Sequence, residues 1–470
     1  MGAIEQQINV SKSYHSMDVN DIKADIQQRL FQEEETLGIE IPYPPMEVWE
    51  DAKIQSPEEI WDFSKGRYDH DKAHLYIHLP FCVSVCDYCI FVTTGGKSAV
   101  EARRYADLVK KEASTYKDVM RSRRFDSVYF GGGTPTYLRT DDLADLLKFL
   151  LDNFNFTEDV EITIEASPDT VNYEKLSTLR NFGANRLSIG VQTFNDTILK
   201  NINRRHNGEK SINAFNAARK AGFENINMDL MYGLPNQTMD TWQKDMDIVA
   251  KLLPETVTLY ALTFRRHSKI YGKDLVYPSS KIKMEMYEYG RNILLENGYS
   301  QLNRNFFTRG GFRNNNFCYQ DNCLHSYPLL GLGASAFSYA PLLPYCNTPD
   351  IEAYSNAIDK DFLPIARGVF ISPEEEKYHY MVLGLKLAAV DKTGFKKQFG
   401  MVPEEMFGNL LQALKELRMV GISDTTIRLT PDGIKYADFI SRLFYSDEIR
   451  NKAMKAGFNR DKKSPEGGRV

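Results

Sequence analysis

Three cysteines lie close together in the segment CVSVCDYC, which begins at residue 82. The chain has six cysteines in 470 residues, too few for a disulfide scaffold, so Cys82, Cys86 and Cys89 are candidate ligands of a metal or a cluster. Iron–sulfur clusters are usually held by four thiolates, and three from one loop would leave one iron open to an outside ligand. An open metal position is where cofactor or substrate chemistry takes place. A zinc site would need a fourth Cys or His nearby, so the spacing favours an open iron–sulfur cluster.

The elements that must position these cysteines alternate between two hydrophobic patterns. Short β-rich runs occupy residues 74–80, 127–133, 161–168, 186–192, 225–235 and 256–263. Amphipathic helical stretches lie between most of them, at 99–120, 141–153, 211–221 and 239–252. Strands that alternate with helices form parallel βα units with right-handed crossovers. The pattern predicts an α/β fold. A partial (β/α)6 TIM-like barrel suits the spacings, and a flat doubly wound sheet is the alternative.

The predicted strands end in residues of unusual chemistry. The first leads into the cysteines and the second into a triple glycine, and the next four end near Glu165, Gln192, Asp229 and Tyr260. In parallel α/β barrels the active site forms at the C-terminal ends of the strands. We therefore expect these residues to converge on one mouth, which is the strongest argument that the protein is an enzyme.

The remaining segments predict further units. Residues 1–73 form a polar N-terminal extension with a helical stretch at 21–37, and 74–345 contain the barrel and its extension. Helical patterns at 374–389 and 404–419, followed by the β-like run 426–433, predict a helical, winged-helix-like C-terminal domain over 346–450. Residues 451–470 contain Lys, Gly and Pro and are expected to be a mobile tail.

Composition excludes several classes of protein. Hydrophobic residues make up 42% and charged residues 26%, which is ordinary for a globular protein, and the net charge is −5. That charge argues against a general nucleic-acid surface. No apolar run approaches the ~20 residues that span a bilayer, and the polar N-terminus does not resemble a secretory signal. We expect a cytoplasmic protein, a monomer, with no nucleic-acid or membrane partner.

The motifs themselves resemble a known family. The segments YIHLPFCVSVCDYC, YFGGGTPT, IEASP, RLSIGVQTF and NMDLMYGLP are similar to those of the radical S-adenosylmethionine (SAM) superfamily. Within it they resemble the oxygen-independent coproporphyrinogen III oxidase family, over about residues 75–263, with a looser match in LGLGASAFS at 330–338. The resemblance implies a [4Fe–4S] cluster on the three cysteines. It also implies that SAM chelates the open iron through its amino and carboxylate groups and is cleaved to a 5′-deoxyadenosyl radical.

The resemblance assigns SAM-site roles to further residues. Tyr76, Glu165 and Gln192 would lie at the reacting part of SAM, and the backbone N–H groups of the GGGT turn would approach its methionyl part. Cofactor contacts are expected from Tyr76, Gly131, Gly132, Gly133, Thr134, Glu165, Gln192, Arg204, Asp229, Tyr260 and Ala261. Ordinary alternatives remain for some: a salt-bridged carboxylate for Glu165, a register slip to Arg205 for Arg204, and core packing for Tyr260 and Ala261.

One position departs from the decarboxylating members of this family. They carry a fourth cysteine two residues after the third, where this chain has Phe91. A Phe there is typical of the heme-chaperone branch and of the class C methyltransferase-like branch. We therefore predict a radical SAM enzyme that uses a second SAM for methyl or methylene transfer (methylation or cyclopropanation) to a heteroaromatic or tetrapyrrole substrate. The alternatives are oxidative decarboxylation of coproporphyrinogen III and a heme chaperone. An electron donor such as flavodoxin or ferredoxin is implied.

Three more groups of residues could take part in binding. Cys318, Cys323 and His325 could hold zinc or a heme iron, could place a thiol in the cavity, or could share no role. Basic residues interleaved with aromatic ones would suit an anionic aromatic substrate or a solvated loop, and the same choice holds for a basic pair after the sixth strand. These residues are Arg304, Phe306, Phe307, Arg309, Phe312, Arg313, Arg265, Arg266 and His267.

Overall fold

The structure is a computed structural model. It describes residues 14, 17–33, 43–52, 56–64, 71–263, 268–271, 273, 275–310 and 327–462. Contacts divide the chain into two compact units. The larger unit contains the described residues from 51 to 310 and from 327 to 368, and the smaller one contains those up to residue 50 and from 369 onward.

Six parallel strands form the centre of the larger unit, in the order in which they occur in the chain. They are β2 (Lys72–Leu79), β5 (Arg124–Gly132), β6 (Phe156–Ala166), β7 (Arg186–Gln192), β8 (Asn225–Tyr232) and β9 (Thr256–Ala261). Each coincides with a run predicted from the sequence. The predicted partial (β/α)6 barrel is confirmed, since the sheet continues beyond both β2 and β9 and, within the described residues, its two edge strands do not pair with each other.

Shorter strands extend the sheet on each side. Beyond β2 lie the parallel strand β12 and then antiparallel neighbours, and beyond β9 lies an antiparallel hairpin. These strands are β12 (Leu329–Leu332), β13 (Phe337–Ala340), β14 (Leu343–Asn347), β15 (Ile365–Gly368) and β1 (Glu50–Asp51), and then β11 (Phe306–Arg309) and β10 (Tyr299–Gln301). The sheet thus continues past residue 345, because β14 and β15 pair with it.

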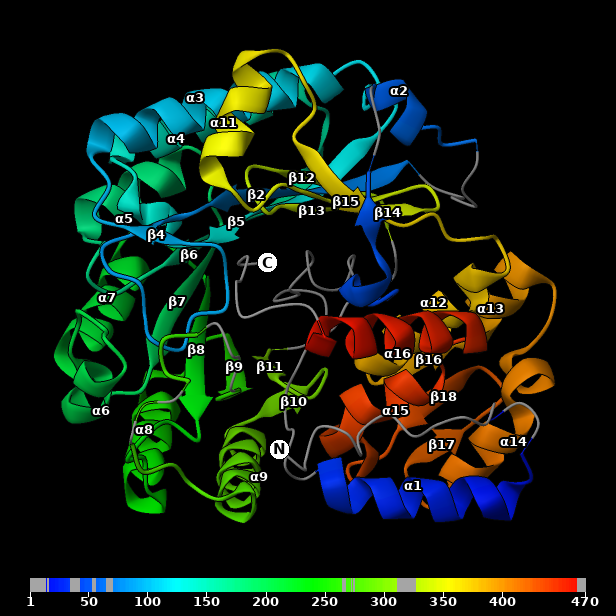
Figure 1. The fold of residues 1–470 in the computed structure, drawn as a ribbon. Helices are drawn as coiled ribbons and strands as arrows, with labels where there is room; N and C mark the ends of the chain where they lie inside the picture. Colours follow the sequence, from blue (N-terminus) through cyan, green and yellow to red (C-terminus); the bar gives the residue numbers. More distant parts are fainter. Residues whose placement is uncertain are drawn as a thin grey trace. The chain divides into compact units, whose positions relative to one another are not determined.

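Helices lie along the outer side of this curved sheet (Figure 1). Capping residues begin several of them: Ser98 forms a capping box with Glu101, and Thr238 does so with Thr241. The predicted helices are present, although the first ends at Tyr116 rather than near Met120. The helices of this unit are α2 (Pro57–Ile60), α3 (Ala99–Tyr116), α4 (Thr140–Asn153), α5 (Tyr173–Asn181), α6 (Asp196–Asn201), α7 (Gly208–Lys220), α8 (Met239–Leu252), α9 (Ser280–Glu296) and α11 (Ile351–Asp359).

Side chains alternate along the barrel strands between an apolar outer face and a polar inner face. On β9, Leu259 faces helix α9, since its Cδ1 is 3.1 Å from the point where a Cβ on Gly290 would lie. The neighbouring Thr258 is on the opposite face and hydrogen-bonds Asn227 of β8 at 3.1 Å. Polar groups on the inner face are unusual for a barrel whose interior is only packed core. The alternation therefore marks the inside of the barrel as the candidate site.

The smaller unit has the element order of a winged helix. Its three-stranded antiparallel sheet has the order β16-β18-β17, and β18 lies in the β-like run predicted at 426–433. The elements are α12 (Glu375–Lys386), β16 (Ala389–Asp391), α13 (Lys392–Phe399), α14 (Pro403–Glu416), β17 (Val420–Ile422) and β18 (Thr426–Leu429). The N-terminal helix α1 (Val19–Glu33) packs on α14, with Lys23 Nζ 2.7 Å from Glu416 Oε2.

Two further α-helices follow in the described part of this unit. They are α15 (Ala437–Leu443) and α16 (Asp447–Lys462), so the first twelve residues of the segment expected to be a mobile tail (451–462) are helical. None of the helices in the described part of the chain is both long and apolar enough to cross a membrane.

Candidate active site

The cysteine loop is closed by a short pair of parallel strands. Phe81 and Cys82 form β3, which pairs with β4 (Thr94–Gly95) in the register Phe81 to Thr94 and Cys82 to Gly95. Within the loop, the Cys89 N–H donates to the Cys86 carbonyl at 3.1 Å. The loop therefore starts just after β2 and is closed by β4, with Cys82 in β3 and Cys86 and Cys89 between β3 and β4.

Each thiol sulfur has a polar neighbour. Thr134 Oγ1 donates to Cys82 Sγ at 3.5 Å, and Arg204 Nη1 donates to Cys86 Sγ at 3.4 Å. The Sγ of Cys89 lies 3.8 Å from Thr93 Oγ1. Hydrogen bonds and positive charge at ligand sulfurs tune the reduction potential of iron–sulfur clusters. The loop thus holds three candidate ligands, and the groups that would adjust them come from the loop itself (Thr93) and from two other segments (Thr134 and Arg204).

The three thiols suit a bound metal centre, which would replace their protons. Burial raises the pKa of Cys82 to about 12 and also raises the pKa of Cys89, so both carry protons unless a metal replaces them. No three His, Cys, Asp or Glu side chains in the described ranges are grouped around one point, as a single ion requires. A four-iron cluster takes its three thiolates on three different irons and does not need such a point. The donor set therefore fits a [4Fe–4S] cluster.

Arg204, rather than its neighbour Arg205, reaches this loop. Besides the Cys86 sulfur it donates to the Gly190 carbonyl, whereas Arg205 is exposed. Gly190 is where β7 bulges, and Gln192 that follows has a φ of 69°. A Cβ on Gly190 would lie 3.0 Å from Gln192 Nε2 and 3.2 Å from Arg204 Nη2. The two expected SAM contacts therefore meet at the end of β7.

The GGGT turn after β5 is packed against β2 and the cysteine loop. A Cβ on Gly133 would lie 2.8 Å from the carbonyl oxygens of both Leu79 and Phe81. The Gly133 N–H donates to Leu79 O at 2.9 Å and the Thr134 N–H donates to Phe81 O at 2.8 Å. These two N–H groups therefore dock the turn on the base of the cysteine loop, where the backbones approach too closely for a side chain. The expected contact between the turn 131–134 and SAM stays a prediction.

Tyr76 is held by a buried histidine. Its hydroxyl lies 3.1 Å from His78 Nδ1, and His78 Nε2 lies 2.9 Å from the Val92 carbonyl. Burial lowers the pKa of His78 to about 4, so the ring is neutral, donates from Nε2 to Val92 and accepts from Tyr76. The Tyr76 ring also stacks on Tyr129, with centroids 6.2 Å apart. These contacts fix Tyr76 beside the end of β2.

Glu165 lies on the inner face of β6. Tyr129 Oη donates to its Oε1 at 2.6 Å, and the Gly132 backbone N–H also donates to this carboxyl. Burial raises its pKa to about 7, against the lowering effect of these two hydrogen bonds, and the nearby Asp229 raises it further. The Glu165 carboxyl thus has a pKa near neutral pH, and a bound cation would stabilise its ionised form.

Asp229 is the second inner-face carboxylate. Ser188 Oγ donates to it at 3.1 Å and Asn227 Nδ2 at 2.7 Å. Burial raises its pKa above the usual range in spite of these bonds. Polar side chains from β7 and β8 therefore satisfy part of the hydrogen-bonding capacity of this buried carboxylate.

Arg186 was missed from the sequence. It begins β7 and is only 1% exposed, with Nη2 3.5 Å from Thr256 Oγ1 and its guanidinium 5.9 Å from the Phe306 ring. Its positive charge lowers the pKa of both Glu165 and Asp229. An arginine in register with Ser188 and Gly190 on the polar face was the available signal. Arg186 is therefore an internal counter-ion of the two carboxylates.

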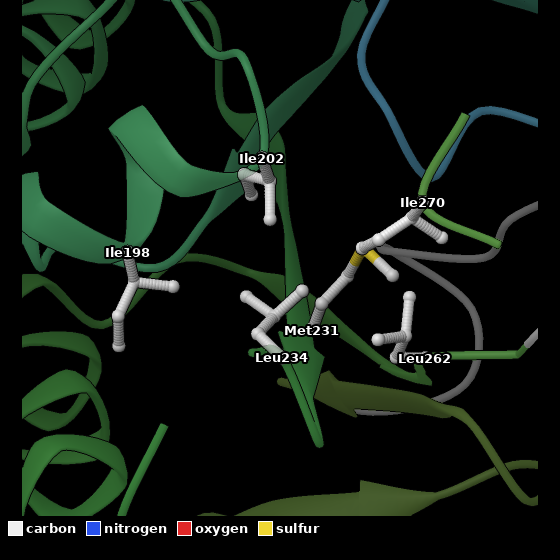
Figure 2. Packing of buried hydrophobic residues seen from close by; sticks show 6 residues of the cluster. All are labelled: Ile198, Ile202, Met231, Leu234, Leu262 and Ile270. Atoms are coloured by element: carbon white, nitrogen blue, oxygen red, sulfur yellow. The ribbon is translucent and has the colours of Figure 1, made fainter. Parts of the chain in front are cut away.

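An apolar cluster packs beside the cysteine loop. Figure 2 shows its six buried residues, which come from α6 and the residue after it, from β8, and from the segments after β8 and β9: Ile198, Ile202, Met231, Leu234, Leu262 and Ile270. Tyr88 of the loop packs against it. Backbone bonds tie the loop to this cluster, from Asp87 N to Ile202 O at 3.2 Å and from Ile270 N to Asp87 O at 2.8 Å.

The remaining residues expected at the site do not form one cluster in the described part of the chain. Tyr260 is 40% exposed at the end of β9, and Ala261 is buried. Arg304 and Arg309 lie at opposite ends of β11, since Arg304 packs on Tyr287 and Arg309 bonds the backbone before β9. They do not form one anion site, and Phe306 and Phe307 between them are buried core residues. The expected groups at 264–267, 312–313 and 318–325 lie outside the described residues.

Several known proteins are similar to this chain in sequence or in fold. The family model of the radical SAM superfamily matches residues 76–249. The heme chaperone HemW of Bacillus subtilis is 30% identical over 76% of this chain and 95% of that protein. HemW of Buchnera aphidicola is 34% identical, but the match spans 48% of this chain and 60% of that protein. Escherichia coli oxygen-independent coproporphyrinogen III oxidase is 28% identical over 84% of this chain and 90% of that protein. Its solved structure, described as a radical SAM enzyme, superposes with a TM-score of 0.74 at 26% identity, covering 82% of this chain and 92% of that one.

Proposed function

Because the chain belongs to the radical SAM superfamily, in the family of HemW and the oxygen-independent coproporphyrinogen III oxidases, we propose that it acts on a tetrapyrrole by reductive cleavage of SAM. Cys82, Cys86 and Cys89 hold the [4Fe–4S] cluster at which SAM is cleaved. One observation carries the proposal. The cysteine loop, in which Arg204 contacts the Cys86 sulfur, lies at the end of a barrel whose interior contains the buried carboxyl groups of Glu165 and Asp229.

The inner-face residues would bind SAM through its charges. SAM carries an ammonium and a sulfonium, and buried carboxylates whose pKa is raised by desolvation are suitable partners for such cations. Glu165 and Asp229 supply the carboxylates, Gln192 and Arg204 supply donors at the end of β7, and Tyr76 lies beside the cysteine loop. The remaining SAM contacts in this proposal are the turn Gly131, Gly132, Gly133 and Thr134, and Tyr260 and Ala261 at the end of β9.

The cluster would supply the electron that splits SAM into methionine and a 5′-deoxyadenosyl radical. The protein supplies binding, orientation and exclusion of water. The electron comes from a small redox protein such as a flavodoxin or ferredoxin, which must reach the cysteine loop.

Oxidative decarboxylation of coproporphyrinogen III is the first candidate reaction. The E. coli oxidase aligns with more of this chain than the B. subtilis chaperone does, 84% against 76%, and its fold matches 82% of the chain. This agreement extends beyond the superfamily region at 76–249. Substrate specificity resides in such additional segments when the cofactor site is common to a superfamily.

Heme binding and delivery is the second candidate. Phe91 occupies the position where decarboxylating members of the family carry a fourth cysteine, and it is 62% exposed beside the cysteine loop. The B. subtilis relative named as a heme chaperone is also slightly more identical to this chain than the oxidase is. The predicted methyl or methylene transfer with a second SAM gains no support from these relatives, whose names state other activities.

Anaerobic turnover tests the proposal. Cluster-reconstituted protein is incubated with SAM, dithionite and either coproporphyrinogen III or heme, and 5′-deoxyadenosine, S-adenosylhomocysteine and tetrapyrroles are measured by mass spectrometry. Protoporphyrinogen with 5′-deoxyadenosine supports the oxidase. Stable heme binding without conversion of either tetrapyrrole supports the chaperone. S-Adenosylhomocysteine formed together with a methylated product would overturn both in favour of methyl transfer, and no SAM cleavage under any condition would refute the radical SAM activity.

A further inference from the structure

Glu112 is a buried carboxylate that the proposed SAM site does not use. It lies on the inner side of α3 and is 0% exposed. Three donors from three other segments reach it: the Gly333 N–H at 2.7 Å, Asn347 Nδ2 at 2.6 Å and Tyr354 Oη at 2.7 Å. Glu112 therefore joins α3 to the turn after β12, to β14 and to α11.

Tyr105 lies two helical turns earlier on the same helix and holds the same turn. Its hydroxyl accepts a hydrogen bond from the Ala334 N–H at 2.7 Å and donates to the His78 carbonyl at 3.2 Å. The turn itself lies on the end of β2, since a Cβ on Gly333 would be 2.5 Å from His78 O. The segment LGLGASAFS (330–338), which has no role in the proposed SAM site, is thus packed against the end of β2 and held there by Tyr105.

The end of β2 is the base of the cysteine loop. His78 holds the Tyr76 hydroxyl and the Val92 carbonyl through its ring. A Cβ on Gly132 would lie 2.6 Å from that ring. One residue further on, Leu79 O accepts from Gly133 N at 2.9 Å. A shift of the His78 backbone would therefore be passed to Tyr76, to the GGGT turn and to the cysteine loop together.

We propose that Glu112 and Tyr105 are positioning residues that fix the end of β2, and through it Tyr76 and the cysteine loop, in the geometry needed for SAM cleavage. Neither residue is expected to touch the cluster or SAM. The proposal rests on the proposed function for its activity readout, but the magnetic spectrum of the cluster reports on the loop independently.

The test uses Tyr105→Phe and Glu112→Gln in the full chain. Tyr105→Phe removes both hydroxyl bonds and keeps the ring that packs on Phe81 and Tyr354, at centroid distances of 5.2 and 5.3 Å. Glu112→Gln keeps the shape and removes one acceptor oxygen for three donors. Iron content, the electron paramagnetic resonance spectrum of the reduced cluster with and without SAM, and kcat and KM for dithionite-driven SAM cleavage are measured.

We expect iron per chain to stay at the wild-type level in Tyr105→Phe. The spectral change that SAM induces in the reduced cluster should differ from that of the wild-type protein. The kcat of SAM cleavage should fall about tenfold, since a misplacement of the reacting groups by the order of 1 Å has large effects on rate. Leu150→Ala on α4 is the matched control: Leu150 is fully buried, and the variant should lose thermal stability while the cluster spectrum and kcat per folded chain remain unchanged.

Wild-type spectra and kinetics in both variants would overturn the proposal. So would a loss of activity that follows only the fraction of folded chain, as in the control, because that result indicates a purely structural role. If the wild-type protein itself fails to cleave SAM, the proposed function is wrong, and the spectra of the reduced cluster still decide whether Glu112 and Tyr105 position the loop.

Discussion

Arg204 Nη1 lies 3.4 Å from the Sγ of Cys86, whereas the adjacent Arg205 is exposed. Of this pair, Arg204, the cofactor contact expected from the sequence, is the one that reaches the cysteine loop. Arg204 also donates to the Gly190 carbonyl, which anchors it between the end of β7 and the cysteine loop. A guanidinium at a ligand sulfur stabilises the added negative charge of a reduced cluster.

Arg204→Leu is therefore expected to lower the reduction potential of the cluster. Hydrogen bonds to charged groups contribute about 1.5 kcal/mol or more, equivalent to roughly 60 mV for a one-electron couple. A redox titration followed by electron paramagnetic resonance measures the shift. Arg205→Leu is the matched control and should leave the potential unchanged. Equal potentials in the two variants would show that the Cys86 contact does not influence the cluster.

Cys82→Ala should abolish cluster assembly and SAM cleavage, because three thiolates are the fewest that hold a four-iron cluster with one open iron. Cys346→Ala is the control, since Cys346 is buried in β14, pairs in register with Phe337 and lies outside the cysteine loop. Iron and sulfide analysis after reconstitution distinguishes the two. Full iron content and SAM cleavage in Cys82→Ala would contradict the assignment of the cluster ligands.

Local sequence patterns predicted the alternating strands and helices of the barrel and the residues at the C-terminal ends of its strands. The six barrel strands were recoverable because alternating or continuous apolar runs are bounded by glycines and polar turns, and Asp229 stood out as a charge within such a run. The sequence could not show that the charge of Arg186 lowers the pKa of Glu165 and Asp229, because those partners belong to neighbouring strands. Tyr129 was missed for a similar reason, since an aromatic residue on a strand is usually core.

The GGGT turn shows a different limit. A run of glycines is compatible with a ligand that approaches the backbone and with a second backbone that does so. Here Leu79 and Phe81 take the N–H groups of Gly133 and Thr134, a contact that only the packing of β2 against β5 creates. The strands beyond β9 and β12 were also missed, because each has five residues or fewer.

Gly132→Ala should damage the site beyond the strain of its backbone. Gly132 has a φ of 102°, and its added Cβ would lie 2.6 Å from the His78 ring. Gly222→Ala is the control, because Gly222 has a φ of 89° and no atom within 4 Å of an added Cβ. The control should lose about 1 kcal/mol of stability and keep SAM affinity. Gly132→Ala should lose more stability and at least tenfold in SAM affinity. Denaturation measures the stability and equilibrium binding measures the affinity. Equal effects in the two variants would show that the contact with the His78 ring does not matter for the site.

Glu112 should make the cluster-free protein less stable as the pH rises. Burial raises its pKa from an ordinary value of 4.5 to about 7, so between these values the folded state binds more protons than the unfolded state. Stability therefore falls as pH rises through this window, by up to about 3 kcal/mol for a shift of this size. Glu112→Gln does not titrate and should show a flatter dependence. Thermal unfolding of both proteins from pH 5 to pH 8 measures the difference, and parallel curves would contradict a raised pKa.

Glu165 should make SAM binding depend on pH near neutrality. Its pKa is raised to about 7 in the protein without SAM, and a cationic ligand binds the ionised carboxylate. Below that pKa the carboxyl must lose a proton before SAM binds, so affinity should fall by up to about tenfold for each pH unit. Glu165→Gln should bind more weakly at pH 8 and show a reduced pH dependence.

Tyr129→Phe tests the same carboxylate through its partner. The Tyr129 hydroxyl donates to Glu165 Oε1 at 2.6 Å and lowers the pKa of Glu165, so its loss should move the midpoint of SAM binding to higher pH. Above that midpoint the affinity should approach the wild-type value, since the ring and its stacking on Tyr76 are retained. Calorimetric titration with SAM at a series of pH values gives both quantities. A midpoint that moves to lower pH would mean that Tyr129 stabilises the protonated form of Glu165, and the proposed charge state of the SAM site would be wrong.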